Sequence, residues 1–268
     1  MNNRGRNPPN RRNNIQVLQA LVGKPAQSLG RPAYEMFASL GHNAADAVLC
    51  GGIRRDALHE VFAAAAGEEA AATGFALALA SRANARHTWL LWVRQDFSAL
   101  ESGEIHGCGL LELGIDPSHL LIVRTPDATA VLRAGTEGLA CKGLGAVIIE
   151  SWGAPNAFDL LTSRKLTLAA QQYGIPAIML RLGARPQPST AETRWLIKAA
   201  VSSPNDDDWG KPVFDAALAR NRHGRTGRWV MEWDGDDGIF CATAAHFGTP
   251  AAIPFDGPVE APMARQAG

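Results

Sequence analysis

Cysteine is scarce in this chain, and no pair of cysteines has the spacing of a metal site. The four cysteines lie far apart in the sequence, at Cys50, Cys108, Cys141 and Cys241, and none forms a C-x-x-C pair. This scatter argues against a zinc site and against a disulfide framework, and it fits a reducing compartment. His106 and Cys108 are close in sequence, but no second pair supports a metal site there. We therefore predict a cytoplasmic protein without a metal ion.

Long hydrophobic runs are also missing. No apolar stretch in the 268 residues approaches the ~20 residues that a membrane-spanning helix needs. Residues 1–14 are polar, and the apolar segment of a signal peptide does not follow them. The sequence therefore predicts neither secretion nor contact with a membrane.

Acidic residues are absent from the beginning of the chain. The 26 basic and 26 acidic residues balance overall, yet no Asp or Glu precedes Glu35. Six basic residues do precede it: Arg4, Arg6, Arg11, Arg12, Lys24 and Arg31. A basic arm of this kind can contact nucleic acid or an acidic protein surface, or it can be a solvated tail. We expect residues 1–44 to form this arm, with short helices at 15–22 and 34–40, and we expect residues 248–268 to form a flexible tail.

Between these ends, residues 45–247 show the pattern of an α/β domain. Apolar runs predict strands at 57–62, 88–93, 120–125, 146–151 and 177–181. The intervening segments predict four helices, which cover 70–83, a stretch from Ser98 to Leu113, the residues after Asp127, and about 157–173 with Asn156 as N-cap. Alternating strands and helices indicate a mostly parallel central sheet flanked by helices. Strands predicted without helices between them, at 193–200, 214–220, 228–233 and 238–242, should add antiparallel strands at the C-terminal edge.

A lysine is missing from the loop that follows the first of these strands. A phosphate-binding loop needs glycines for close backbone approach, a lysine for the β- and γ-phosphates, and a Ser or Thr for magnesium. This loop offers one glycine, Gly67, and then places Glu68 and Glu69 where positive charge is needed. Carboxylates repel a triphosphate, so we predict a degenerate P-loop, no bound cofactor and no ATPase activity. Neither a G-x-S-x-G elbow nor a G-x-G-x-x-G fingerprint suggests another enzyme class.

Two acidic residues stand near the expected carboxyl ends of strands, where α/β sheets bind ligands. Glu150 ends an apolar strand, as a magnesium-binding acid does, but without a phosphate lysine it is better interpreted as a structural acceptor or an N-cap. Asp96 is either a water-activating acid or a loop residue before a helix, and we favour the loop residue. We therefore assign no catalytic residue.

The densest basic feature of the chain lies between the predicted strands at 214–220 and 228–233. Within residues 219–229, glycines mark a turn at which four arginines gather: Arg220, Arg222, Arg225 and Arg228. Guanidinium groups suit carboxylate or phosphate partners. These arginines are our candidates for partner binding, and the alternative is a hairpin turn made soluble by its charges. For Trp195, Trp229 and Trp233 nearby, a place in the core is favoured over a place in an interface.

Several segments together resemble one family. Residues 46–61 (DAVLCGGIRRDALHEV) resemble the entry of bacterial RecA-like domains into the P-loop strand. With 73–79 (TGFALAL), 113–123 (LGIDPSHLLIV), 193–195 (TRW) and 221–234 (NRHGRTGRWVMEWD), they are similar to the ImuA family of SOS-induced, RecA-like accessory proteins of translesion mutagenesis. The resemblance spans residues 45–240. Where that fold carries its catalytic glutamate, this chain has Gln95 nearby.

This resemblance implies a RecA-like fold and a set of partners. The partners would be RecA, the polymerase homologue ImuB and an error-prone C-family DNA polymerase, with DNA contacted indirectly or through the basic arm. The chain would then be a non-catalytic adaptor of SOS-induced DNA repair synthesis. Three alternatives stay open: a SulA-like inhibitor of cell division, a DNA-binding module, and a RecA/KaiC-type ATPase in which Lys142, Arg94 or Arg181 supplies the missing charge.

Overall fold

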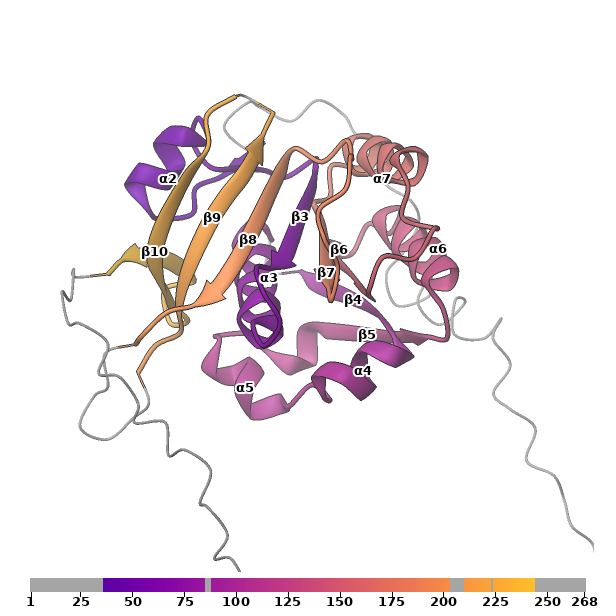
Figure 1. Ribbon diagram of the computed structural model, residues 1–268, viewed down its shortest axis with the longest axis horizontal. Coiled ribbons are helices and arrows are strands. Elements are labelled where there is room, and N and C mark those ends of the chain that lie inside the picture. Colours follow the sequence, from indigo (N-terminus) through magenta and orange to yellow (C-terminus); the bar gives the residue numbers. More distant parts are fainter. Residues whose placement is uncertain (1–35, 85–87, 203–209, 223, 244–268) are drawn as a thin grey trace, which may run out of the picture.

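The structure of the protein is a computed structural model that describes residues 36–84, 88–202, 210–222 and 224–243. Most of the predicted basic arm, its helix at 15–22 and the whole predicted tail at 248–268 lie outside the described residues. The described residues form a nine-stranded sheet with helices on both faces, beside a small two-stranded sheet (Figure 1). The predicted α/β fold is confirmed.

The large sheet has the strand order β11-β10-β9-β8-β3-β7-β6-β4-β5. Its parallel part consists of β3 (Leu58–Ala63), β4 (Trp89–Gln95), β5 (Leu120–Thr125), β6 (Leu144–Trp152), β7 (Ala177–Leu182) and β8 (Thr193–Ala199). Its antiparallel part consists of β9 (Val213–Asn221), β10 (Gly227–Asp234) and β11 (Ile239–Ala242). The central strands β3, β6 and β7 are buried along nearly their whole length, as strands covered on two faces should be.

One strand runs differently from the prediction. β8 was expected among the antiparallel strands, but it pairs parallel to β3. The chain returns from the end of β7 to the start of β8 through residues 183–192, without a helix. Two hydrogen bonds fix this connection to its neighbours: Thr190 N donates to Ser163 Oγ at 3.1 Å, and Glu192 N donates to the Leu58 carbonyl. An extended crossover therefore replaces the helix that normally joins parallel strands.

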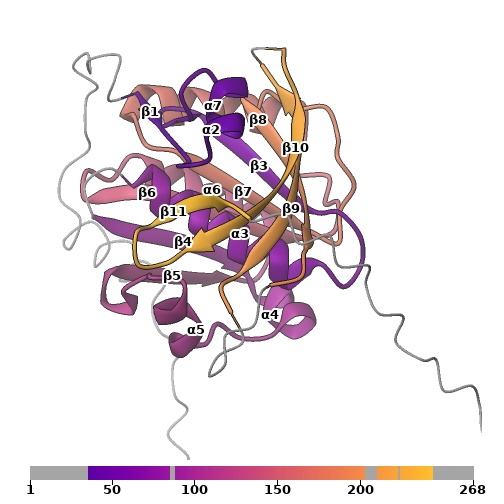
Figure 2. The same cartoon turned by 90° about the vertical axis from the view of Figure 1, so that its left-hand side faces the viewer.

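Helices divide the interior into two cores. α3 (Glu69–Ala83) packs on one face of the sheet, and α6 (Ala128–Leu139) and α7 (Leu160–Tyr173) pack on the other. The antiparallel end of the sheet twists so that β9 and β11 also contact α3 (Figure 2). Phe75 of α3 lies 5.2–5.6 Å, centroid to centroid, from the rings of Trp195, Phe214 and Phe240. The parallel and antiparallel parts therefore share one core.

Three local predictions are wrong. The helix expected at 34–40 is replaced by β1 (Phe37–Ala38), which pairs with β2 (Ile53–Arg54), and the helix before β2 is α2 (Asn43–Val48). The single helix expected from Ser98 to Leu113 is two helices, α4 (Asp96–Ser102) and α5 (Gly107–Glu112), with a break at Gly103, whose φ of +83° is the left-handed conformation that favours glycine. The short η2 helix (Pro117–His119) follows α5.

The third wrong prediction concerns the start of α7. Asn156 does not cap this helix; Asp159 does, because its carboxylate accepts a hydrogen bond from Thr162 N at 2.7 Å. This hydrogen bond lowers the pKa of Asp159 below its usual value. The other end agrees with the sequence, since Gly174 ends α7 in the left-handed conformation.

Candidate functional site

The loop between β3 and α3 stands where a nucleotide would bind in a fold of this kind. Gly67 has a φ of +89°, and its N–H donates to the carboxylate of Glu69 at 2.8 Å. The carboxylate of Glu68 reaches the end of β8 and accepts from Ala199 N at 2.7 Å. The loop therefore turns a carboxylate toward the glycine N–H, which is the type of donor that cradles phosphates in a P-loop.

Glu150 is fully buried at the carboxyl end of β6. Its carboxylate accepts from Trp92 Nε1 at 2.7 Å and pairs with Arg94 Nη2 at 3.1 Å. Burial raises the pKa of Glu150, and the ion pair with Arg94 opposes that rise. Each of the two carboxylate oxygens accepts a hydrogen bond inside the core, which agrees with the interpretation of Glu150 as a structural acceptor.

The cations considered as replacements for the missing lysine lie elsewhere. Arg94 pairs with Glu150, and its guanidinium also donates to the Gly103 carbonyl at 3.3 Å. Lys142 precedes β6, at the amino edge of the parallel strands, whereas Gly67 lies at their carboxyl edge. Arg181 is at the carboxyl end of β7 but packs on the face of α7, opposite to α3. The structure brings none of the three to Gly67.

The four candidate arginines lie at one end of the β9–β10 hairpin, but they have different roles in it. Arg220 donates from Nη1 to the Ser189 carbonyl at 2.5 Å, and Arg228 forms a two-pronged ion pair with Asp215. The ion pair lowers the pKa of Asp215. Arg222 and Arg225 are exposed. Arg220 and Arg228 therefore have partners within the protein, although the Arg228 side chain is 63% exposed, and Arg222 and Arg225 also face solvent.

The hairpin is far from the loop at Gly67. Asn221 pairs with Thr193, the first residue of β8, so the turn lies at the amino edge of the parallel strands. Trp195 and Trp233 are almost fully buried, and Trp229 packs against the same core. The favoured interpretation of these tryptophans as core residues is confirmed.

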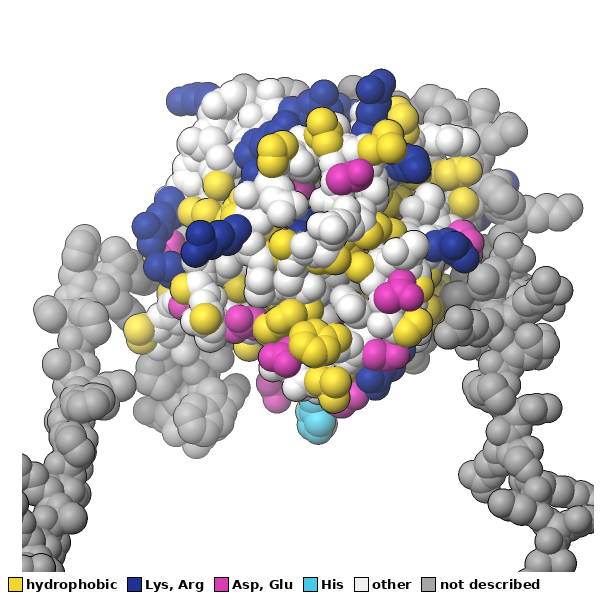
Figure 3. Space-filling view, turned by 45° about the vertical axis from the view of Figure 1, so that its right-hand side comes forward, with side chains coloured by type: hydrophobic (Ala, Val, Ile, Leu, Met, Phe, Trp, Pro, Cys, Tyr) yellow, Lys and Arg dark blue, Asp and Glu magenta, His cyan; other side chains and the backbone are white. Residues whose placement is uncertain are grey.

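An exposed apolar patch on α4 and α5 was not found in the sequence. Phe97, Leu100 and Leu111 are 44%, 80% and 61% exposed, respectively. Acidic side chains gather around this lower end of the molecule, and basic side chains are more frequent toward the opposite end (Figure 3). The sequence pattern predicted one continuous helix here and therefore missed the patch. The break at Gly103 changes which side chains face outward. Asp96, which we favoured as a loop residue before a helix, is instead the first residue of α4, and its carboxylate pairs with Arg124 Nε at 3.0 Å.

The described part of the chain has neither a cluster of metal ligands nor a membrane-spanning helix. In those ranges, no group of three or more His, Cys, Asp or Glu side chains is arranged to hold a metal ion. In the same ranges, no helix has both the length and the apolar character needed to cross a membrane.

Comparisons with known proteins found similarity to two curated relatives. No protein-family model matches the chain. The chain is similar to Protein ImuA of two strains of Caulobacter vibrioides, NA1000 / CB15N and ATCC 19089 / CIP 103742 / CB 15. Identity to each is 32% over 136 residues, covering 46% of this chain and 54% of the relative. The chain thus spans about half the length of the curated relatives it matches.

Proposed function

We propose a function that proceeds from one premise, the assignment of this chain to the ImuA family, which its similarity to the Caulobacter proteins supports. The chain acts in SOS mutagenesis as a non-catalytic adaptor with a RecA-like fold. It binds RecA, and it binds ImuB and the C-family polymerase with which ImuB works. It turns over no ATP.

The loop at Gly67 carries the non-catalytic part of this proposal. A P-loop presents backbone N–H groups and a lysine to a polyphosphate. Here the Gly67 N–H is engaged by Glu69, and a second carboxylate, from Glu68, closes the loop against β8. A triphosphate entering this loop would have to displace the Glu69 carboxylate from the Gly67 N–H and would lie close to the Glu68 carboxylate. Like charges repel strongly at such short distances.

The surfaces available for partners lie at opposite edges of the sheet. Arg222 and Arg225 face solvent at the amino edge, on a hairpin held in place by Arg220 and Arg228. The apolar patch of α4 and α5 lies toward the carboxyl edge and is surrounded by acids. An adaptor that joins two proteins needs two separate contacts. We assign the arginine hairpin to one of them because guanidinium groups recognise acidic surfaces well.

The first experiment tests nucleotide binding. Equilibrium titration of the full chain with a fluorescent ATP analogue and Mg²⁺ should give a Kd weaker than about 10 µM. No DNA-stimulated phosphate release should be detected. Robust turnover that Glu150→Gln abolishes would reject the adaptor proposal and favour the ATPase alternative.

The second experiment tests the arginine hairpin. Tagged protein should capture purified RecA and purified ImuB in separate assays, and the double variant Arg222→Glu and Arg225→Glu should lose one of these partners. The matched control is Arg133→Glu, which reverses an exposed charge on α6. Because the hairpin contacts of Arg220 and Arg228 are left intact, the double variant should fold normally. Equal loss in the control, or no loss in the double variant, would remove the hairpin from the interface.

A further inference from the structure

Arg181 is a buried cation without a close anion. Its side chain is only 3% exposed, and among the described residues no carboxylate oxygen lies within ion-pairing distance of it. Its one hydrogen bond is long, from Nη2 to the Gly153 carbonyl at 3.4 Å, and its Nε has no partner in the described part of the chain. Burial lowers the pKa of Arg181, and the nearby Glu60 charge only partly opposes this. Buried guanidinium groups normally have a bound anion, because removing a charge from water is costly.

Two aromatic rings hold this guanidinium in position. Its central carbon lies 4.6 Å from the ring centroid of Phe158 and 5.8 Å from that of Phe62. Cation–π contacts orient a guanidinium and leave its N–H edge free for a planar acceptor. Arg181 is therefore fixed in place before any ligand arrives.

Further unpartnered polar atoms lie beside Arg181. Ser151 is its register partner on β6, and Gln95 ends the next strand, β4. Ser151 Oγ and Gln95 Oε1 are both buried without a hydrogen-bond partner in the described residues. Buried polar groups in folded proteins rarely lack a partner, and such groups near one another indicate that a polar ligand or water binds there. All three residues are at the carboxyl ends of parallel strands, where α/β sheets bind ligands.

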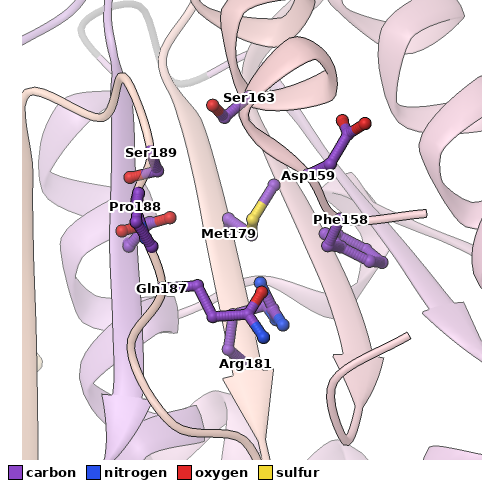
Figure 4. Close-up of a pocket in the computed structure, with 9 residues that line it drawn as sticks. Phe158, Asp159, Ser163, Met179, Arg181, Gln187, Pro188 and Ser189 are labelled. Carbon is purple, nitrogen blue, oxygen red and sulfur yellow. The ribbon is translucent and has the colours of Figure 1, made fainter. Parts of the chain in front are cut away.

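An open cavity lies next to the guanidinium, and its empty volume of about 240 Å³ includes the adjoining solvent. Figure 4 shows Gln187 beside Arg181, Ser163 at the opposite end, and Pro188 and Ser189 facing Phe158 across the cavity. Two carboxylates also line it, but each has its own partner. Glu60 pairs with Arg194 Nε at 2.7 Å, and Asp159 caps α7 through Thr162 N at 2.7 Å. Arg181 therefore remains the one lining cation, with hydroxyl groups across from it.

We propose that this cavity is a binding site for a small oxyanion, a free molecule with one carboxylate or phosphoryl group that accepts hydrogen bonds from Arg181. The hydroxyl group of Ser189 is placed to donate to the far side of the anion, whereas that of Ser163 already donates to the Leu160 carbonyl at 2.8 Å. This site is separate from the loop at Gly67 and does not depend on the adaptor function.

Calorimetric titration of the full chain tests the proposal, with inorganic phosphate in one arm and acetate in the other, in a chloride buffer. At least one of the two should bind with a Kd below about 10 mM. The arm that binds identifies the group as phosphoryl or carboxylate. Absence of binding in both arms would overturn the proposal.

Variants connect the binding to this cavity. Arg181→Met should abolish binding, whereas Arg164→Met, on the exposed face of α7, should leave it unchanged. Since Arg181→Met removes a buried side chain, Gln187 provides a second pair of variants at an exposed position. Gln187→Glu should weaken binding about tenfold or more by repulsion, and Gln187→Arg should strengthen it. Equal affinities in these two variants would show that the anion binds elsewhere, and the proposal would be wrong.

Discussion

At the scale of single residues, the structure gives different roles to the four arginines of the hairpin, which the sequence alone does not distinguish. From their spacing alone, all four arginines are equally good candidates for partner binding. In the folded chain, Arg228 pairs with Asp215 across the hairpin and Arg220 binds a backbone carbonyl, which leaves Arg222 and Arg225 for partners. The sequence located this turn, but the ion pair depends on the β9–β10 register, which spacing alone does not give.

The pair of Arg228 and Asp215 has a predictable pH dependence. Its hydrogen bonds lower the pKa of Asp215 in the folded state, so the pair stabilises the fold above the unfolded pKa of about 3.9. That stability is lost as the pH falls through the folded pKa. In Arg228→Met, the pKa of Asp215 should rise toward its ordinary value. The decrease in the free energy of unfolding on acidification should then be smaller than in the unmodified protein. Carboxyl-carbon NMR titration of both proteins measures this, and identical titration curves would contradict the ion pair.

At the scale of secondary structure, apolar periodicity predicted most elements, and contacts distant in sequence explain the errors. β5 occupies the residues expected for it, 120–125, and α3 differs from its prediction by one residue. The direction of β8 was wrong because it depends on how residues 183–192 cross back over α7 and β3. The anion cavity at Arg181 is formed by the same crossover, so no local pattern in the sequence could reveal it.

Helix caps provide a test at this scale. Asp127 caps α6 by accepting from Ala130 N at 2.8 Å, so Asp127→Ala should lower the free energy of unfolding by about 1 kcal/mol. The matched control is Asn156→Ala, which alters the residue that the sequence alone names as a cap and that caps nothing in the structure. It should change stability by less than about 0.5 kcal/mol. Urea unfolding measures both variants, and a larger effect at Asn156 would favour the sequence interpretation over the structure.

At the scale of the whole molecule, α3 joins the parallel and antiparallel parts of the large sheet. It packs under the parallel strands, and its Phe75 also contacts aromatic rings from β8, β9 and β11. The antiparallel strands carry the arginine hairpin, while the parallel strands carry the loop at Gly67 and the anion cavity. A shared core would keep these sites at fixed separations, as an adaptor with two contacts requires.

Phe75→Ala tests this coupling between the two parts of the sheet. The ring is fully buried, so its loss should cost about 3–5 kcal/mol. Leu100→Ala, at a position that is 80% exposed, should cost little and serves as the control. Thermal unfolding of both variants should remain a single transition. Circular dichroism monitors the helices, and tryptophan fluorescence monitors the aromatic core. Two separate transitions in Phe75→Ala would mean that the antiparallel strands unfold independently, and the hairpin would then sit on a separate unit.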